Sequence, residues 1–308
     1  MPGTTRHEFL FVSDSIREAI ATEQPIVALE TTLVTHGFPS HEGLDLALEL
    51  EDIVRAEGAA PATIGVLDGH LIVGLTPDQV NRLALSSSVV KLNPANLAAG
   101  IASGQPGSAT VAATMLAANL AGIQVLATGG IGGVHRDAQS SGDISADLTA
   151  LSRLPVAVVC SGAKAILDLP KTLEALETAG VPVYGNRTER FPAFYRRDSG
   201  LLLDRGFESV EALSSAIRTH FALSPGTGIV IANPISAKYE MQEGVYEKAL
   251  EQLLQEADRE KMRGREVTPF LLARLRELTN HESSFSNKHL LKANAYFAAQ
   301  LACALLQK

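Results

Sequence analysis

The chain has 308 residues, of which 46% are hydrophobic and 19% are charged, and its formal net charge is −8. A chain of this length and composition can bury a large core and is typical of a globular protein. The acidic balance argues against nucleic acid and anionic membranes as partners, and any phosphate ligand would need a local positive charge.

The chain contains two cysteines, Cys160 and Cys303, which are too few and too far apart for a disulfide framework or a zinc cluster. We expect both to be core residues in a reducing compartment. The N-terminal segment lacks a cationic region followed by a long apolar run, and no stretch reaches about 18 continuous apolar residues. These features predict a cytoplasmic protein.

Short β-branched runs alternate with longer segments of helical period, which is typical of an α/β protein. Strands are expected over residues 25–30, 63–67, 70–74, 88–92, 123–128, 156–161, 182–185 and 228–233. Most of these runs are apolar on both faces, which favours helices on both sides of the sheet. Asp68-Gly69 predicts a type I′ hairpin and therefore one antiparallel pair. The sequence thus predicts a three-layer α/β/α fold around a mixed, mostly parallel central sheet.

Two helices near the C-terminal end of the sequence have clear patterns. The segment 243–258 places six residues on one amphipathic face: Tyr246, Ala249, Leu250, Leu253, Leu254 and Ala257. The segment 286–306 has a broad face of alanine and leucine that would pack on the body or on a sister subunit. No repeat, low-complexity linker or composition break divides the chain, so we expect a single domain over residues 1–308. The longest expected loops are 129–144 and 186–199, and long loops are usually functional or disordered.

Ligands of covered α/β sheets bind at the carboxyl ends of the strands. Polar residues lie at several expected strand ends: Glu30-Thr31-Thr32, Lys91, Thr128-Gly129-Gly130, Ser161-Gly162-Ala163-Lys164 and Asn233-Pro234. Glu30 follows an apolar run, so a desolvated carboxyl there would suit a general acid, or it would cap the turn. Lys164 lies among small and apolar residues, where a neutral amine would form a Schiff base with a carbonyl. The alternative is a solvated lysine in the first turn of a helix.

Three further positions are candidates for holding a phosphate or hydroxyl group. Lys91 would bind such a group or form an ordinary salt bridge. Ser108 and Thr110 stand where a helix is expected to begin, so their hydroxyls and the free amides of that first turn would accept a phosphate, or they would only cap the helix. We expect both Thr110 and Thr128 to bind the substrate.

The stretch "GGIGGVHRD" at 129–137 is rich in glycine but matches neither the dinucleotide-binding nor the Walker pattern, so it indicates only close approach of the backbone to a ligand. Asp143 and Asp147 stand four apart, and on a helix they would share a face suited to a hydrated divalent cation and a substrate hydroxyl. They would otherwise favour the helix dipole. His135 would pair with a phosphate or hydroxyl, or be merely exposed.

Two further candidate functional clusters lie outside the expected strand ends. The segment 186–199 interleaves four arginines with three aromatic residues, and in this acidic chain a subunit contact or a lid is favoured over nucleic-acid binding. Asn287 stands where a helix is expected to begin. Its amide would read a nucleobase edge or cap the helix.

Together these motifs resemble the pseudouridine-5′-phosphate glycosidase family. The resemblance runs from about residue 10 onward and rests on ordered motifs: "ALETTLVTHGFP", "VKLNPANL", "ATGGIGGVHR", "DISADL", "VVCSGAKAILDLPKTLEALETAGVPV", "FPAF", "NPI", "TPFLLARLRELT" and "SNKHLLKANA". It implies reversible cleavage of pseudouridine 5′-phosphate to uracil and ribose 5-phosphate by a cytoplasmic homotrimer with a divalent metal, most often Mn²⁺. Its partners would be small molecules, with neither nucleic acid nor membrane among them.

The resemblance also assigns roles to residues. Lys164 would form an imine with C1′ of the opened ribose, Glu30 would donate a proton in ring opening, and Asp143 would belong to the metal site. The substrate would be contacted by Lys91, Val111, Ser145, Ala146 and Asp147, with His135 near the sugar phosphate and Asn287 on the uracil. The loop "RDAQSSG" and the segment "RTERFPAFYRRDSG" are less familiar, which leaves product release and subunit contacts open.

An imine would supply the electron sink that cleavage of a C–C bond needs, because no leaving oxygen is present for the paired carboxylates of ordinary glycosidases to protonate. Two other functions are compatible with the residues alone. A Schiff-base aldolase acting on a sugar phosphate would use the same lysine, acid and phosphate site. A non-catalytic nucleotide-binding protein would bind its ligand without a covalent adduct.

Overall fold

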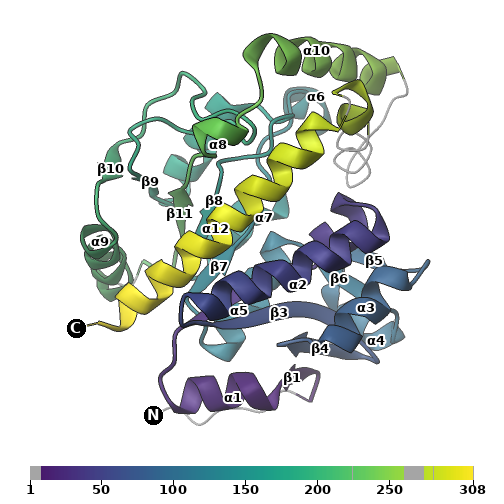
Figure 1. Cartoon of the computed structure of the whole chain (residues 1–308), viewed down its shortest axis with the longest axis vertical. Helices are drawn as coiled ribbons and strands as arrows, with labels where there is room; N and C mark the ends of the chain where they lie inside the picture. The colour runs from purple at the N-terminus through teal and green to yellow at the C-terminus, as the bar shows by residue number, and fades with distance from the viewer. Residues whose placement is uncertain (1–7, 224, 260–273, 280, 308) are drawn as a thin grey trace.

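The computed structural model describes residues 8–223, 225–259, 274–279 and 281–307 (Figure 1). The first part of the "TPFLLARLRELT" motif, residues 268–273, lies outside the described residues. The side chains of Leu254 and Ala257, expected on the face of the 243–258 helix, lie outside them as well.

A mixed sheet forms the centre of the described chain. Its strands are β1 Leu10–Val12, β2 Ile26–Leu29, β3 Ala60–Leu67, β4 His70–Val73, β5 Val90–Leu92, β6 Gly107–Ala109, β7 Val125–Ala127, β8 Ala157–Cys160, β9 Val183–Asn186, β10 Arg205–Phe207 and β11 Ile229–Ala232. The order is β1-β4-β3-β2-β7-β8-β11-β9-β10, and β6 joins β5 to β3. Among the described strands, β3 pairs antiparallel with β4 and β6, and the other pairs are parallel. The predicted mixed, mostly parallel sheet is confirmed.

Each expected strand is present, and the hairpin forms where it was predicted. Asp68 and Gly69 both have positive φ, 51° and 73°, as a type I′ turn requires, and Leu67 pairs with His70 across it. The helix expected to begin within 107–110 starts at Val111 with Thr110 as its N-cap, because Gly107 and Ser108 pair in β6. A Cβ on Gly107 would fall 2.1 Å from the side chain of Leu92, so only glycine can pair here.

Helices cover both faces of the sheet. They are α1 Asp14–Ala21, α2 Ser40–Ala56, α3 Pro77–Leu85, α4 Leu97–Ser103, α5 Val111–Ala121, α6 Ala138–Ser141, α7 Ala146–Leu151, α8 Leu169–Thr178, α9 Val210–Leu223, α10 Glu243–Arg259 and α12 Glu282–Leu306, with a π-helix at Leu33–Gly37 and a 3₁₀ turn at Ala237–Tyr239. In Figure 1, α12 and α2 lie side by side in front of the central strands, and α5 and α7 lie behind them. This arrangement is the expected three-layer α/β/α fold.

The long helix α12 packs on the centre of the sheet. It contacts β2, β7 and β8 along its length, and α2 and α9 lie on either side of it. Its buried side includes Leu290, Ala298 and Leu301, which are fully enclosed. The predicted alanine and leucine face therefore packs on the body of the same chain.

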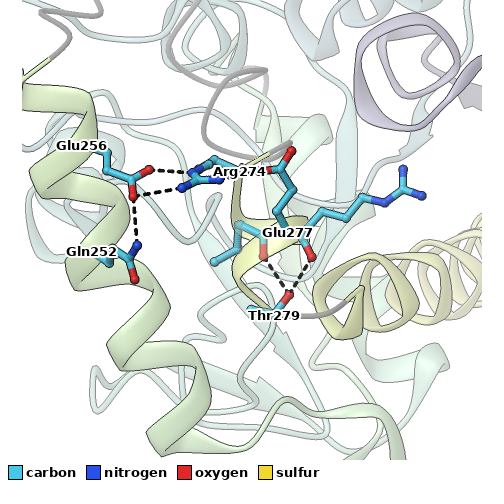
Figure 2. A network of polar contacts seen from close by, with 7 residues as sticks. Gln252, Glu256, Arg274, Glu277 and Thr279 are labelled. Carbon is cyan, nitrogen blue, oxygen red and sulfur yellow. Dashed lines mark hydrogen bonds and ion pairs between the residues drawn. The ribbon is translucent and has the colours of Figure 1, made fainter.

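The helix α10 is amphipathic as predicted, since Tyr246, Ala249 and Leu253 are buried. Arg274 ties it to the segment 274–279 that precedes α12 (Figure 2). The Arg274 Nε donates to Glu256 Oε2 at 2.7 Å, and its Nη1 donates to Glu277 Oε2 at 2.5 Å. The first ion pair connects α10 to the segment that precedes α12, and the second lies within that segment.

No helix among the described residues is long and apolar enough to cross a membrane. Cys160 is buried as expected, whereas Cys303, which was expected in the core, is only half-buried on α12.

Candidate active site

A cavity with two adjoining lobes opens at the carboxyl ends of the central strands. The polar lobe, about 450 Å³, is lined by Asn93, Asn96, Thr110, Val111, His135, Asp143, Ser145, Ala146 and Asp147, among others. The apolar lobe, about 60 Å³, is lined by Leu33, His36, Phe38, Thr128, Phe194, Asn287 and Leu291, among others. Glu30, Thr32, Lys91 and Lys164 line both lobes. The structure therefore brings every predicted site residue to one cavity.

Glu30 lies at the junction of the lobes, directly after β2, and is 8% exposed. The Thr128 hydroxyl donates a hydrogen bond to its Oε1. Burial raises the pKa of Glu30 above the usual range of a carboxyl, and the positive charges of Lys164 and Lys91 oppose this rise. A carboxyl with a raised pKa retains its proton to higher pH, so Glu30 suits a general acid.

Lys164 lies in a loop between β8 and α8, not in the first turn of a helix. Its backbone N–H donates to Ile131 O at 3.0 Å, and Leu167 N donates to its carbonyl at 3.0 Å. The side chain is half-buried in the cavity, close enough for its charge to act on Glu30. The small and apolar neighbours of Lys164 in the sequence suggest an enclosed lysine, and the structure shows a half-buried side chain that lines both lobes.

Lys91 supplies a second positive charge to the cavity. It is half-buried at the middle of β5, and burial lowers its pKa, as does the nearby charge of Lys164. The carboxylates of Asp147 and Glu30 act in the opposite direction. Among the described residues Lys91 has no ion-pair partner within 4 Å, so the ordinary salt bridge considered as its alternative role is not formed.

The glycine-rich stretch folds into a hairpin-like excursion. Val134 bridges Ile144, His135 N donates to Asp143 O at 3.1 Å, and the short helix α6 lies at the tip. The excursion places the His135 Nε2 and the Asp143 Oδ2 3.9 Å apart on its inner side. The two residues thus lie side by side in the wall of the polar lobe.

Gly129, Gly130 and Gly132 of this stretch line the cavity, and protein side chains also pack closely on its glycines. A Cβ on Gly132 would fall 2.1 Å from the Ser145 Oγ, and one on Gly133 would fall 2.4 Å from the Thr172 Oγ1. The backbone lies this close to its neighbours because no side chain stands between them.

Asp147 and Asp143 do not share a helical face, because α7 begins at Ala146 with Ser145 as its N-cap. The Asp147 side chain is 5% exposed and accepts two backbone hydrogen bonds, from Ala112 N at 2.9 Å and from Gly132 N at 2.8 Å. It joins the start of α5 to the glycine-rich excursion. Asp147 is therefore a structural tie as well as a wall of the polar lobe.

The first turn of α5 is less open to a phosphate than the sequence suggested. Ala112 N donates to Asp147, and Ala113 N donates to the Thr110 Oγ1 at 3.4 Å, so these amides are not free. Thr110 is the N-cap, which confirms that alternative, and it still lines the polar lobe. Ser108 lies in β6, and its Oγ is 3.4 Å from the His36 Nδ1.

Asn287 is in the second turn of α12 and does not cap that helix, which begins at Glu282. Its side chain lines the apolar lobe and is 8% exposed. The Oδ1 atom is buried and has no hydrogen-bond partner among the described residues. A buried acceptor without a donor is costly, so this atom points to a ligand that would donate to it.

Asp143 has a carboxylate that would bind a divalent cation. Its side chain is 25% exposed, and among the described residues no hydrogen-bond donor occupies its carboxylate apart from the weak His135 contact. The described residues contain no group of three or more ligating side chains, so water would supply the other ligands. Mn²⁺ and Mg²⁺ accept a single carboxylate with several waters.

Three residues of the site were missed by sequence reasoning. His36 follows β2 in a π-helix, an element that is frequent at functional sites, and burial lowers its pKa, as does the charge of Lys91. Phe194 forms a wall of the apolar lobe. Asn294 is buried on α12, where its Nδ2 donates to Thr128 O at 2.7 Å and its Oδ1 accepts from Asn233 Nδ2 at 2.8 Å. The motifs "THGFP" and "FPAF" were the available signals for the first two.

The arrangement can perform carbonyl chemistry on an anionic substrate. An amine and a proton-donating carboxyl lie at the junction of a polar lobe and an apolar lobe. The polar lobe holds cationic and hydroxyl groups, which suit a phosphorylated sugar. The apolar lobe has aromatic walls and one unpaired acceptor, which suit a planar ring with N–H groups.

Comparison with known proteins agrees with this geometry. The family model of indigoidine synthase A like proteins matches residues 15–304. The chain is 46% identical to the pseudouridine-5′-phosphate glycosidase of Caldanaerobacter subterraneus, over 97% of both chains, and 48% identical to that of Methylobacterium nodulans, over 97% of this chain and 89% of the other. Among solved structures, a prealnumycin C-glycosynthase in complex with ribulose 5-phosphate is 37% identical over 97% of both chains, with a TM-score of 0.89.

Proposed function

Because the chain belongs to the pseudouridine-5′-phosphate glycosidase family, we propose that it reversibly cleaves the C–C bond of pseudouridine 5′-phosphate to give uracil and ribose 5-phosphate. The observation that carries the proposal is the placement of Lys164 beside Glu30 at the junction of the two lobes. The ribose phosphate would occupy the polar lobe and the uracil would occupy the apolar lobe, so that the bond to be broken would lie between them.

Glu30 begins the reaction. Burial raises the pKa of its carboxyl, which favours the protonated form, and Glu30 gives this proton to the ring oxygen of the ribose as the ring opens. The Lys164 amine takes the place of the ring oxygen at C1′ and loses a proton, which gives a secondary amine at that carbon. The C–C bond then breaks: its electron pair passes to C5 of uracil, which takes up a proton, and the nitrogen lone pair forms the double bond of the imine at C1′. Water then hydrolyses the imine, which returns the lysine and releases ribose 5-phosphate.

The polar lobe orients the sugar phosphate. Lys91 supplies positive charge and His135 a ring N–H to the phosphate, while Thr110, Val111, Ser145, Ala146 and Asp147 form the walls of the lobe. Binding the phosphate away from the reacting bond fixes the position of C1′ relative to Lys164. In the apolar lobe, the unpaired Oδ1 of Asn287 accepts an N–H of the uracil.

Asp143 would hold a divalent cation, Mn²⁺ for preference, which would supply positive charge for the sugar hydroxyls and phosphate. We also propose a homotrimer in the cytoplasm. Two free cysteines, one buried and one half-buried, are compatible with a reducing compartment. Light scattering of the purified protein measures the subunit number.

The test of the proposed function has two measurements. Incubation with pseudouridine 5′-phosphate should release uracil, detected by chromatography. Incubation with ribose 5-phosphate and then borohydride should add one reduced ribose phosphate to Lys164, located by peptide mass spectrometry. The variant Lys164→Arg should lose both results, since a guanidinium does not form the imine, and Lys171→Arg is the matched control on the exposed start of α8.

Three outcomes would contradict the proposal. Cleavage of a sugar phosphate without release of uracil would indicate an aldolase. Ligand binding that survives Lys164→Ala with no adduct at any stage would indicate a non-catalytic binding protein. An unmodified Lys164 in an enzyme that does release uracil would remove the imine from the mechanism.

A further inference from the structure

The segment 186–199, for which the sequence favours a subunit contact or a lid, has a buried part and an exposed part. Its aromatic residues, Phe191, Phe194 and Tyr195, are at most 3% exposed within this one chain. Two of its arginines bind backbone carbonyls of the same chain: Arg196 donates to Met241 O at 2.9 Å, and Arg197 donates to Ile235 O at 2.8 Å. Residues 191–195 are therefore part of the protein interior, whereas Arg187, Glu189, Arg190 and Asp198 are exposed.

Phe194 has an unusual backbone conformation. Its φ is +62°, in the left-handed region that bulky side chains rarely adopt. Three contacts hold it there. Its N–H donates to Ser161 O at 2.9 Å, the preceding Ala193 bridges both Gly162 and Arg196, and the rings of Phe194 and Tyr195 meet edge-on at 4.7 Å. Strain of this kind persists only where the surroundings enforce it, and it is concentrated at functional sites.

The ring of Phe194 is fixed from the other side by the strand end that follows β7. A Cβ on Gly130 would fall 2.6 Å from the Phe194 Cδ2, and one on Gly129 would fall 3.4 Å from its Cε2. The ring thus packs directly on the backbone of these glycines and has no room to move toward them. Its remaining surface lines the apolar lobe, with Leu33, Phe38 and Leu291.

We propose that Phe194 is the specificity-determining residue of the apolar lobe, where its rigid ring admits a base with one ring and excludes a base with two. The lobe is small, about 60 Å³, and Phe194 is the wall whose backbone and ring are both held in place. Because this ring cannot rotate away, the second ring of a larger base would clash with it. The inference rests on the proposed function, because it takes the apolar lobe as the site of the base.

The test compares the binding of uracil with that of xanthine, which contains the same pyrimidinedione ring fused to a second ring. Dissociation constants are measured by ligand-observed NMR titration of the full chain, without sugar phosphate, so that no bond forms. The native protein should prefer uracil by about tenfold or more, and Phe194→Ala should reduce that preference by about tenfold. Phe285→Ala, which removes a phenyl ring that is 54% exposed on α12, is the matched control and should keep the preference.

The ratio of the two dissociation constants, measured on the same protein sample, does not change when a fraction of the molecules is unfolded. Phe194→Leu retains more of the buried volume, and it should move the ratio in the same direction, by about threefold, even if the alanine variant does not fold. A native protein that binds both bases equally or binds neither, or a ratio unchanged in the folded variants, would overturn the inference. Preferential uracil binding without release of uracil from pseudouridine 5′-phosphate would overturn only the proposed function.

Discussion

The Thr128 hydroxyl donates a hydrogen bond to the Glu30 carboxylate from the neighbouring parallel strand end, since Leu29 pairs with Ala127 in the sheet. This bond favours the charged form of Glu30, whereas burial of the carboxyl favours the neutral form and has the larger effect. The pKa of Glu30 therefore depends on two opposing effects, the hydrogen bond from Thr128 and the burial of the carboxyl.

Thr128→Val removes the donor and keeps the shape of the side chain. Without the hydrogen bond the pKa of Glu30 should rise further, so the decline of kcat/KM at high pH should move upward by roughly half to one pH unit. The pH dependence of uracil release measures this shift. The control is Thr219→Val, on the exposed side of α9. A high-pH limb that stays in place or moves downward would show that Glu30 is not the proton donor.

Removal of the metal should abolish turnover. Treatment with EDTA should stop uracil release, Mn²⁺ should restore it, and Asp143→Asn should weaken Mn²⁺ binding by roughly tenfold or more. Binding is followed directly by the electron paramagnetic resonance signal of free Mn²⁺, independently of activity. Asp137→Asn changes an exposed carboxylate of the same excursion and serves as the control. Full activity in the presence of chelator would exclude the proposed role of Asp143.

Asp147→Asn should destabilise the fold. An amide offers one acceptor and one donor, so one of the two backbone N–H groups, of Ala112 or Gly132, would lose its partner in a buried place. The expected loss of unfolding free energy is about 2 kcal/mol. Urea denaturation measures it, with Asp45→Asn on the exposed face of α2 as the comparison. Equal midpoints for both variants would mean that the two hydrogen bonds contribute little.

His36→Gln should make the stability less dependent on pH. The pKa of His36 is lowered in the folded state, by burial and then by Lys91. As the pH falls below the ordinary histidine pKa of about 6.5, the unfolded chain takes up a proton that the folded chain does not, so native stability decreases. The variant should lose this part of the decrease between about pH 7 and pH 5, as measured by thermal unfolding. An identical pH dependence in the native protein and the variant would contradict this, and His41→Gln is the exposed control.

The parts of the fold that follow from local sequence were predictable. The apolar runs of β2, β7, β8 and β11 mark buried parallel strands, and Asp68-Gly69 specifies its own hairpin. Because the site lies at the ends of such strands, Glu30, Thr128 and Lys164 could be found from their position alone.

The parts that depend on distant residues were not predictable. Gly107 pairs with Val66 and Val90, which are distant in sequence, and Leu92 packs where its side chain would be; nothing in "GSAT" records these neighbours. Asp147 is oriented by amides 35 and 15 residues away in sequence. The conformation of Phe194 is set by Ser161 and Gly162, so its strain cannot be recognised in "FPAF".

The position of α12 has a consequence for the synthesis of the chain on the ribosome. This helix follows every described strand in the sequence, yet it covers the centre of the sheet at β2, β7 and β8 and brings Asn287 to the cavity. While the nascent chain lacks it, the apolar surface of these three strands has no cover from α12 and invites aggregation. Folding is therefore completed late, and we expect chaperones that shield nascent hydrophobic surface to improve the yield.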